Sequence, residues 1–395
     1  MIYLDSHATT PVDRRVLDAM LPYFTEHFGN ASSRNHAYGW QASKAVERAR
    51  EQVAALINVR FRDVIFTSGA TESNNLAIKG LAARAPDNRR HIVTVATEHR
   101  AVLDSCRAVE RQGFRVTRLG VDACGRLDLQ QLAESISDDT LLVSVMSGNN
   151  EIGVLHPLGE VARIAHARGA LVHCDAVQSV GLLPLDARAL EIDLVSLSAH
   201  KVYGPKGIGA LYVGRTTSPL GPLDLAPLID GGGHERGYRS GTLNVPGIVG
   251  FGKAAELCRE SAATEAPRIG ALRDRLWSSL SRTLEGMRVN GPLDGRLPQN
   301  LNVRIEGVHG EMLLKGVASD LAVSSGAACA TASAEPSHVL LALGLDEEAA
   351  RASIRFGLSR FTTEDEIDAA ATKVTAVVQQ LRAGRAAAVS SQRGI

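Results

Sequence analysis

The stretch ALVHCDAVQSVGLLPLDARALEIDLVSLSAHK, residues 170–201, decides the fold. It contains two short apolar runs, at 170–174 and 193–197; Asp175 directly follows the first, and Lys201 comes soon after the second. Consecutive apolar residues, without alternation, are typical of parallel strands that are buried on both faces. Ligands of such sheets bind at the carboxyl ends of the strands. The stretch therefore predicts that Asp175 and Lys201 lie at the same edge of one sheet.

The same pattern extends in both directions along the chain. Further apolar runs occur at 64–67, 91–95, 141–145 and 208–213, and helical patterns lie between them at 41–57, 74–83, 101–112 and 158–168. This alternation predicts an α/β fold with a large, mostly parallel sheet that helices cover on both faces. Residues 215–233 are rich in Gly and Pro and predict a loop.

The pattern changes near residue 258, where a long predicted helix, 263–284, is followed by strands and helices in another order. We expect a large cofactor-binding domain at 13–257 and a smaller C-terminal α+β domain at 258–384, which residues 1–12 complete. The last stretch, 385–395, has no core pattern and is expected to be a disordered tail.

Composition limits the classes of function. The 395 residues are 45% hydrophobic, and 43 basic residues balance 43 acidic ones, so charge gives no argument for a nucleic-acid or membrane partner. The chain has no 18-residue apolar run, and its N-terminus does not resemble a secretory signal. Five scattered cysteines without a C-x-x-C pair argue against a disulfide framework and a structural zinc site, and favour a reducing cytoplasm.

Three polar features follow predicted strands. The small residues Ser68, Gly69, Ala70 and Thr71 could cradle a phosphate or simply cap a helix. Asp175 could pair with a pyridine nitrogen or form an ordinary ion pair, and Lys201 could form a Schiff base or lie solvated on the surface. Each feature is ordinary alone, but pyridoxal phosphate needs an anion site, a pyridinium partner and a lysine together. The combination predicts this cofactor.

Many ordered motifs then carry a resemblance to a known family. They are Tyr3-Leu-Asp, Ala8-Thr-Thr-Pro, Phe66-Thr-Ser-Gly-Ala-Thr-Glu-Ser, Thr97-Glu-His, Asn149-Asn-Glu-Ile-Gly, His173-Cys-Asp-Ala-Val-Gln-Ser, His200-Lys-Val-Tyr-Gly-Pro-Lys-Gly, Gly231-Gly-Gly-His-Glu-Arg-Gly, Arg239-Ser-Gly-Thr-Leu, Ser324-Ser-Gly-Ala-Ala-Cys and Ile354-Arg-Phe-Gly-Leu-Ser-Arg-Phe. From Tyr3 to about Leu381 the chain resembles cysteine desulfurases of the iron–sulfur-cluster and nitrogen-fixation type, in the class V aminotransferase family. The resemblance implies the aminotransferase-like fold of fold type I pyridoxal-phosphate enzymes.

The resemblance also implies a role for each matching residue. Lys201, His99 and Cys329 resemble the catalytic residues: the Schiff-base lysine, the histidine stacked on the ring and the sulfur-accepting cysteine. Cofactor contacts are implied for Ala70, Thr71, Ser198 and His200 at the phosphate, Asp175 at the pyridine nitrogen, and Asn150 and Gln178 at the ring hydroxyl. Thr242 resembles a phosphate contact from the neighbouring subunit, which implies a homodimer. Arg355 resembles the clamp on the substrate carboxylate, and Asn30 and Asn35 are candidates for positioning the substrate.

The implied reaction converts L-cysteine to L-alanine and leaves the sulfur on Cys329 as a persulfide, from which it passes to an acceptor protein. Small residues surround Cys329 without apolar periodicity, whereas the other four cysteines are expected to be core or surface residues. Cys174 should point away from Asp175, because neighbouring side chains of a strand face opposite ways. No resident metal is expected, although Cys329 could serve as a transient iron–sulfur ligand. Iron–sulfur assembly, tRNA thiolation and DNA sulfur modification all remain open as destinations.

The chain departs from the family pattern in three places. Ser6-His7 replaces the usual Tyr-Ser or Asn-Asn; His7 could alter the site entrance, but a loop side chain without a role is the favoured interpretation. Ala327, Ala330 and Thr331 replace hydroxyl-bearing family residues beside Cys329. The chain also stops soon after its last predicted helix, where cluster-assembly members carry a segment that binds a scaffold protein.

Two other classes of function stay open. A selenocysteine lyase or an aminotransferase would share the cofactor, but an aminotransferase would release a keto acid and leave Cys329 unused. A non-enzymatic scaffold that recruits sulfur acceptors would gain no sulfur atom from cysteine.

Overall fold

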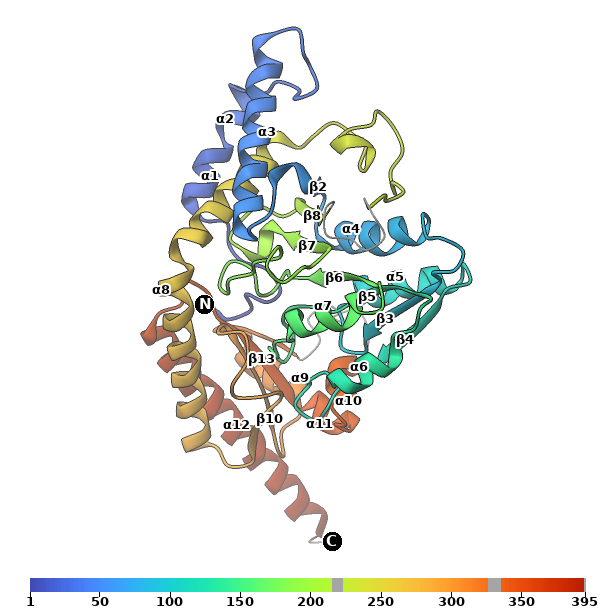
Figure 1. Cartoon of the computed structure of the whole chain (residues 1–395). Helices are drawn as coiled ribbons and strands as arrows, with labels where there is room; N and C mark the ends of the chain where they lie inside the picture. Colours follow the sequence, from blue (N-terminus) through green and yellow to red (C-terminus); the bar gives the residue numbers. More distant parts are fainter. Residues whose placement is uncertain (215–222, 326–334, 394–395) are drawn as a thin grey trace.

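In the computed structural model, the described residues are 1–214, 223–325 and 335–393, with side chains up to 384. Cys329 and its altered neighbours lie outside these ranges. The core of the chain is a seven-stranded sheet with the order β2-β8-β7-β6-β5-β3-β4 (Figure 1). Its strands are β2 (Val64–Thr67), β3 (His91–Val95), β4 (Arg115–Leu119), β5 (Thr140–Ser144), β6 (Leu171–Asp175), β7 (Leu194–Ser198) and β8 (Gly209–Val213). Only β8 runs against its neighbours in this sheet, so the mostly parallel sheet is confirmed.

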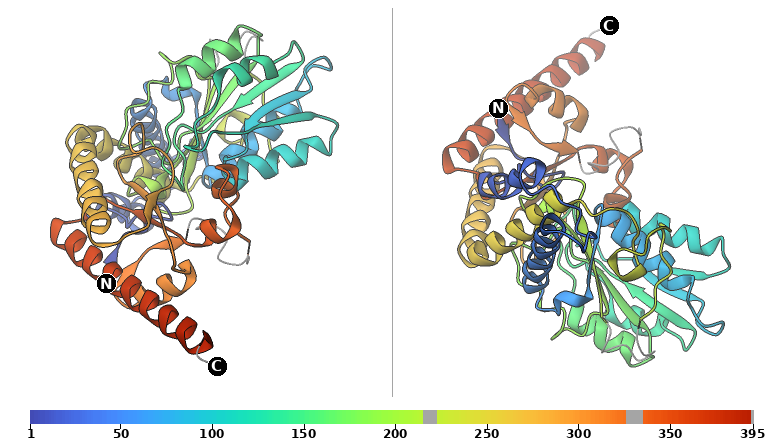
Figure 2. Two further views of the ribbon diagram at one scale, coloured as in Figure 1. Left: turned by 90° about the horizontal axis from the view of Figure 1, so that it is seen from below. Right: turned by 90° about the horizontal axis from the view of Figure 1, so that it is seen from above.

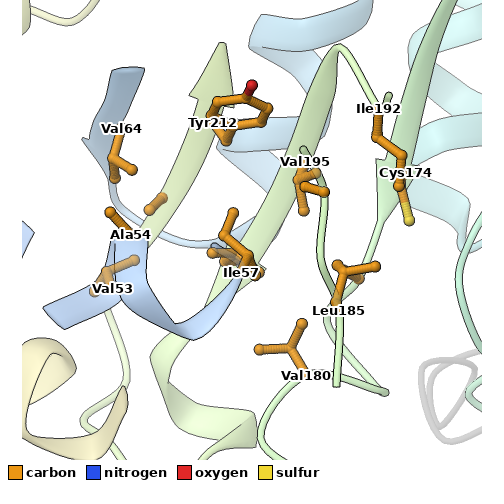
Figure 3. Packing of buried hydrophobic residues seen from close by; sticks show 14 of the residues in the cluster. Val53, Ala54, Ile57, Val64, Cys174, Val180, Leu185, Ile192, Val195 and Tyr212 are labelled. Carbon is orange, nitrogen blue, oxygen red and sulfur yellow. The ribbon is translucent and has the colours of Figure 1, made fainter. Parts of the chain in front are cut away.

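Both faces of the sheet are buried, as the continuous apolar runs require. Along β6, Leu171 packs on one face and Val172 on the other, and Leu194 and Val195 of β7 divide in the same way. Figure 3 shows Val195 and Tyr212 on the face that meets α3. The helices around the sheet are α1 (Arg14–Met20), α2 (Pro22–Thr25), α3 (Ala37–Leu56), α4 (Ala70–Asn75) with a π-helical continuation (Leu76–Gly80), α5 (Arg100–Glu110), α6 (Leu129–Ser135) and α7 (Leu158–His166).

A smaller unit has its own core beside this sheet (Figure 2). Its antiparallel sheet has the order β12-β13-β10-β9, and β1 pairs in parallel with β11. The elements are β1 (Ile2–Tyr3), β9 (Met287–Val289), β10 (Asn300–Ile305), α9 (Gly310–Val317), β11 (Leu321–Ala322), β12 (Ser324–Ser325), α10 (His338–Ala342), α11 (Glu347–Arg351), β13 (Ser353–Gly357) and α12 (Glu364–Arg393). Leu4 belongs to this core, so the N-terminal residues pack with the C-terminal part of the chain.

One long helix, α8 (Val245–Thr283), connects the two cores. Its first half contributes Phe251 and Cys258 to the large core, and its second half contributes Ile269 and Leu280 to the small one. The sequence predicted a helix only over 263–284, because glycines lower the helix propensity of the first half. These glycines permit close packing: a Cβ at Gly252 would lie 2.6 Å from the Cα of Ala49 in α3.

The predicted disordered tail is wrong for residues 385–393, which continue α12 to Arg393. The sequence there includes Ala386, Ala387 and Ala388, and alanine has the highest helix propensity of all residues. A segment without a core pattern can therefore still be helical, because it can continue a helix whose earlier residues are already packed. None of the helices in the described ranges has the length and apolar content of a transmembrane span.

The edge of the large sheet at β2 is closed by a buried ion pair. Arg50 on α3 donates to both carboxylate oxygens of Glu235, at 2.6 and 2.8 Å, and also to the carbonyl of Val64 at 2.8 Å. Glu235 in turn accepts the backbone N–H of Phe66 at 2.7 Å. The Arg50 and Glu235 side chains thus form hydrogen bonds with backbone groups of β2 that a further strand would otherwise pair.

We predict that Arg50→Ala destabilises the protein by about 3–5 kcal/mol, because it leaves the buried Glu235 carboxylate without its cation. The free energy of unfolding in urea measures this loss. Arg14→Ala is the control, since the Arg14–Asp18 pair is exposed at 79% and 54%, and it should change stability by less than about 1 kcal/mol. Equal effects of the two substitutions would contradict the assignment.

Candidate active site

A pocket of about 650 Å³ lies where the parallel strands end. The segments that follow β2, β3, β5, β6 and β7 line it, together with residues of the N-terminal segment and Arg355 from β13. The structure brings ten of the predicted residues together there: Ala70, Thr71, His99, Asn150, Asp175, Gln178, Ser198, His200, Lys201 and Arg355. Residues far apart in sequence thus meet at the predicted edge of the sheet.

Asp175 is held firmly at the end of β6. Its carboxylate is buried and accepts from the side chain of Asn74 at 2.8 Å and from the backbone N–H of Val177 at 3.1 Å. Cys174 packs into the large core, while Asp175 lines the pocket, which confirms that they face opposite ways. The carboxylate is therefore fixed in place before any ligand arrives.

Lys201 follows β7 by a single 3₁₀ turn (Ala199–Lys201). Its ammonium donates to the carbonyl of Ala8 at 2.8 Å and also to the carbonyl of His7. The interpretation of His7 as a loop side chain without a role does not fit the structure, because His7 is only 2% exposed and lines the pocket. The neighbouring residue His200 has its pKa lowered to about 4, chiefly by burial and then by Lys201. It is therefore neutral near pH 7.

Two glycines leave open space at the end of the pocket that was predicted to hold phosphate. Gly69 and Gly207 have φ of +154° and +79°, and a Cβ at either position would meet no atom within 4 Å. Lys206, which the sequence interpretation missed, supplies a positive charge beside them. Open backbone with a nearby cation fits a phosphate group.

Arg355 reaches the pocket from the small unit. It is 1% exposed; its guanidinium donates to the Asn150 carbonyl at 2.8 Å and to Asp5 at 3.1 Å. The Arg355 Nε and the Asn150 side-chain oxygen are buried without a hydrogen-bond partner. Unpaired buried polar atoms are costly. Two of them lie beside one pocket, which fits a polar ligand at this site.

His99 caps α5, since its Nδ1 accepts the backbone N–H of Ala101 at 3.1 Å, and this contact fixes the ring at the pocket wall. The structure does not bring every candidate together. Asn30, Asn35 and Thr242 are exposed and do not line the pocket of their own chain. Asn30 instead accepts the backbone N–H of Ser32. Among the described residues, no three His, Cys, Asp or Glu side chains gather as metal ligands.

Two buried acids that the sequence interpretation missed lie beside the site. Burial raises the pKa of Glu98 well above its ordinary value, although its carboxyl accepts the Met146 N–H at 2.7 Å. Burial also raises the pKa of Glu151 to about 7, partly offset by a hydrogen bond from Ser337. The motifs contain both glutamates, but the raised pKa of each follows from its burial, which the motifs do not show.

We predict that Glu151→Gln reduces the pH dependence of stability. The folded carboxyl has a pKa of about 7 against an ordinary 4.5, so the folded state binds more protons than the unfolded state between these values. Stability therefore falls as pH rises through this window, by up to an order of 3 kcal/mol. The amide is neutral throughout, so urea unfolding at pH 5 and pH 8 should differ less in the variant. Exposed Glu134→Gln is the control, and identical pH profiles for Glu151→Gln and the parent would refute the assignment.

Comparisons with known proteins agree with this geometry. Residues 2–370 match the aminotransferase class-V family. A cysteine desulfurase IscS from Anaeromyxobacter sp. (strain Fw109-5) is 57% identical over 381 residues, which cover 96% of this chain and 93% of the relative.

Solved structures give the same result. A NifS-like protein superposes with a TM-score of 0.89 at 38% identity, covering 96% of this chain and 99% of that one. The structure of SspA in complex with cysteine has a TM-score of 0.79 at 36% identity, covering 92% and 100%. The chain therefore belongs to the aminotransferase class-V family, among its cysteine desulfurases.

Proposed function

We propose that this chain converts L-cysteine to L-alanine with pyridoxal phosphate and transfers the sulfur to Cys329 as a persulfide. The observation that carries the proposal is the convergence of Asp175, Lys201 and Arg355 on one pocket, whose wall also holds the unpartnered Asn150 oxygen. An anion site, a carboxylate, a lysine and a guanidinium are together what this cofactor and an amino-acid substrate require.

The residues of the pocket fit the cofactor. Lys201 would carry it, and Asp175 would pair with the ring nitrogen. Ala70, Thr71, Ser198 and His200 would contact the phosphate, beside the open backbone of Gly69 and Gly207. Asn150 and Gln178 would contact the ring hydroxyl, and His99 would lie on the ring. The cofactor supplies an electron sink that stabilises negative charge at the substrate Cα.

The chain's own side chains perform the remaining tasks. Arg355 would hold the substrate carboxylate through its unpartnered Nε edge, in exchange for part of its contact with Asp5. Lys201 would accept the Cα proton, and His99 would move protons near the sulfur. The Cys329 thiolate then bonds to the substrate sulfur while the Cβ–S bond breaks. The electron pair left on carbon takes up a proton, and alanine leaves.

A homodimer and a sulfur-accepting protein complete the proposal. Thr242 is exposed and absent from its own chain's pocket, which fits a phosphate contact made in a second copy. Phe24, Phe28, Tyr38 and Trp40 are between 49% and 64% exposed near the start of α3, and exposed aromatic side chains are of the kind that protein interfaces bury. The sulfur destination is iron–sulfur cluster assembly or another thiolation pathway. We also propose a cytoplasmic location, on the five scattered cysteines without a C-x-x-C pair.

We predict that Cys329→Ser keeps the yellow cofactor but loses alanine formation from L-cysteine, by at least about a hundredfold, because the sulfur acceptor is gone. Amino-acid analysis measures alanine, and mass spectrometry of the cysteine-treated protein should show added sulfur only in the parent. Cys124→Ser is the matched control and should behave as the parent. Unchanged turnover of Cys329→Ser, or keto-acid product from the parent, would exclude the proposed chemistry.

We predict separately that Lys201→Ala abolishes the visible absorbance of lysine-bound cofactor, because no other amine is proposed to carry it. Absorbance spectra after reconstitution with pyridoxal phosphate measure this. Lys206→Ala should keep the absorbance and bind the cofactor more weakly, since Lys206 contributes charge near the phosphate end only. A parent protein that stays colourless would overturn the proposal as a whole.

A further inference from the structure

His7 lies in the wall of the proposed cofactor pocket, and both nitrogens of its imidazole contact neighbouring side chains. Its Nδ1 lies 2.8 Å from the Gln178 side-chain oxygen, and its Nε2 lies 3.0 Å from the Asn300 side-chain nitrogen. Only 2% of the residue is exposed. A buried ring with both nitrogens in contact has one orientation.

The surroundings fix which ring nitrogen carries the proton. Asn300 accepts from Arg296 at 2.7 Å with its side-chain oxygen, and donates to the Glu151 carbonyl at 3.1 Å with its nitrogen. These two contacts orient the amide, so its nitrogen faces His7 as a donor. His7 Nε2 must then accept, and Nδ1 must carry the proton and donate to Gln178. A second ring proton would face the Asn300 N–H, so the imidazole is neutral.

The same network orients Gln178. Its oxygen accepts from the His7 ring, and its nitrogen donates to the His7 backbone carbonyl at 3.2 Å. Both ends of the amide are thus tied to one residue, and the second N–H of the nitrogen remains for the pocket that Gln178 lines. The His7 carbonyl also accepts from Lys201. One residue therefore contacts both the proposed ring-hydroxyl ligand and the proposed cofactor-bearing lysine.

We infer that His7 is a positioning residue that, as a neutral Nδ1-protonated imidazole, directs the Gln178 side-chain amide toward the hydroxyl of the bound cofactor. Each group in this hydrogen-bond chain donates to the next: Arg296 donates to Asn300, Asn300 to His7, and His7 to Gln178. This inference rests on the proposed function, because it gives the orientation of one of the proposed cofactor contacts. It assigns His7 a task that its location in the N-terminal segment does not indicate.

The test compares two substitutions that differ in the hydrogen bond. His7→Asn keeps an N–H close to the place of Nδ1, whereas His7→Phe keeps the ring volume and removes the donor. A hydrogen bond to an ionised hydroxyl favours the ionised form. The absorbance of the lysine-bound cofactor should therefore titrate about one pH unit higher in His7→Phe, and within about 0.3 units of the parent in His7→Asn.

A double substitution shows whether the effect passes through Gln178. In a Gln178→Ala background, His7→Phe should add no further shift of the absorbance titration, because the amide that it directs is gone. The Kd for pyridoxal phosphate, from equilibrium dialysis, should rise about tenfold in His7→Phe and not rise again in the double variant. If His7→Phe does not fold, His7→Ala removes the same donor without adding bulk and gives the same readout.

The inference is overturned if the folded His7→Phe and His7→Ala variants titrate as the parent does, or if their shift persists undiminished without Gln178. Neither result would touch the proposed function, which depends on cofactor binding and alanine formation by the parent protein. A parent that binds no cofactor would instead remove both.

Discussion

The parallel register of β6 and β7 is the constraint on which the site depends. Asp175 pairs with Ser196, so the chain that continues beyond Ser196 leaves the sheet at the same edge at which Asp175 ends its strand. After one 3₁₀ turn, Lys201 comes back over this edge. Because the sheet is buried on both faces, a slip of one residue would move Asp175 from the pocket into the core, where an unpaired carboxylate is costly. The burial of the sheet on both faces thus fixes the positions of Asp175 and Lys201 relative to each other.

A second constraint comes from the small unit, which supplies Arg355 to a pocket made otherwise mostly by the large one. Burying a guanidinium requires partners, and Asp5 and the Asn150 carbonyl provide them. Asp5 belongs to the N-terminal segment, which also supplies the carbonyls that receive Lys201. The first residues of the chain therefore connect the proposed substrate clamp with the proposed cofactor lysine. Their packing against the small core is part of how the site is assembled.

The sequence could predict the strands of the large sheet and the residues at their ends, because continuous apolar runs and short-range pattern determine both. Cys174 and Asp175 were placed on opposite faces by strand geometry alone. The sequence could not predict the contact of Lys201 with His7 and Ala8. This contact joins segments more than 190 positions apart, and no periodic pattern in the sequence indicates it. The glycine-rich first half of α8 was missed for another reason, since close packing against α3 outweighs its low helix propensity.

The turn at Glu235 and Arg236 connects the edge of the sheet with the proposed dimer. Both residues have positive φ, 48° and 59°, a conformation that costs non-glycine residues on the order of 1–3 kcal/mol each. Glu235 is held by Arg50 and Phe66, and Arg236 donates to the Val64 carbonyl at 2.9 Å. Both residues line a second pocket of the chain, separate from the pocket that holds Lys201, and the segment that follows them reaches the exposed Thr242. In the proposed homodimer this segment would have to keep its shape before the second copy arrives, and the buried Arg50–Glu235 ion pair would provide this rigidity.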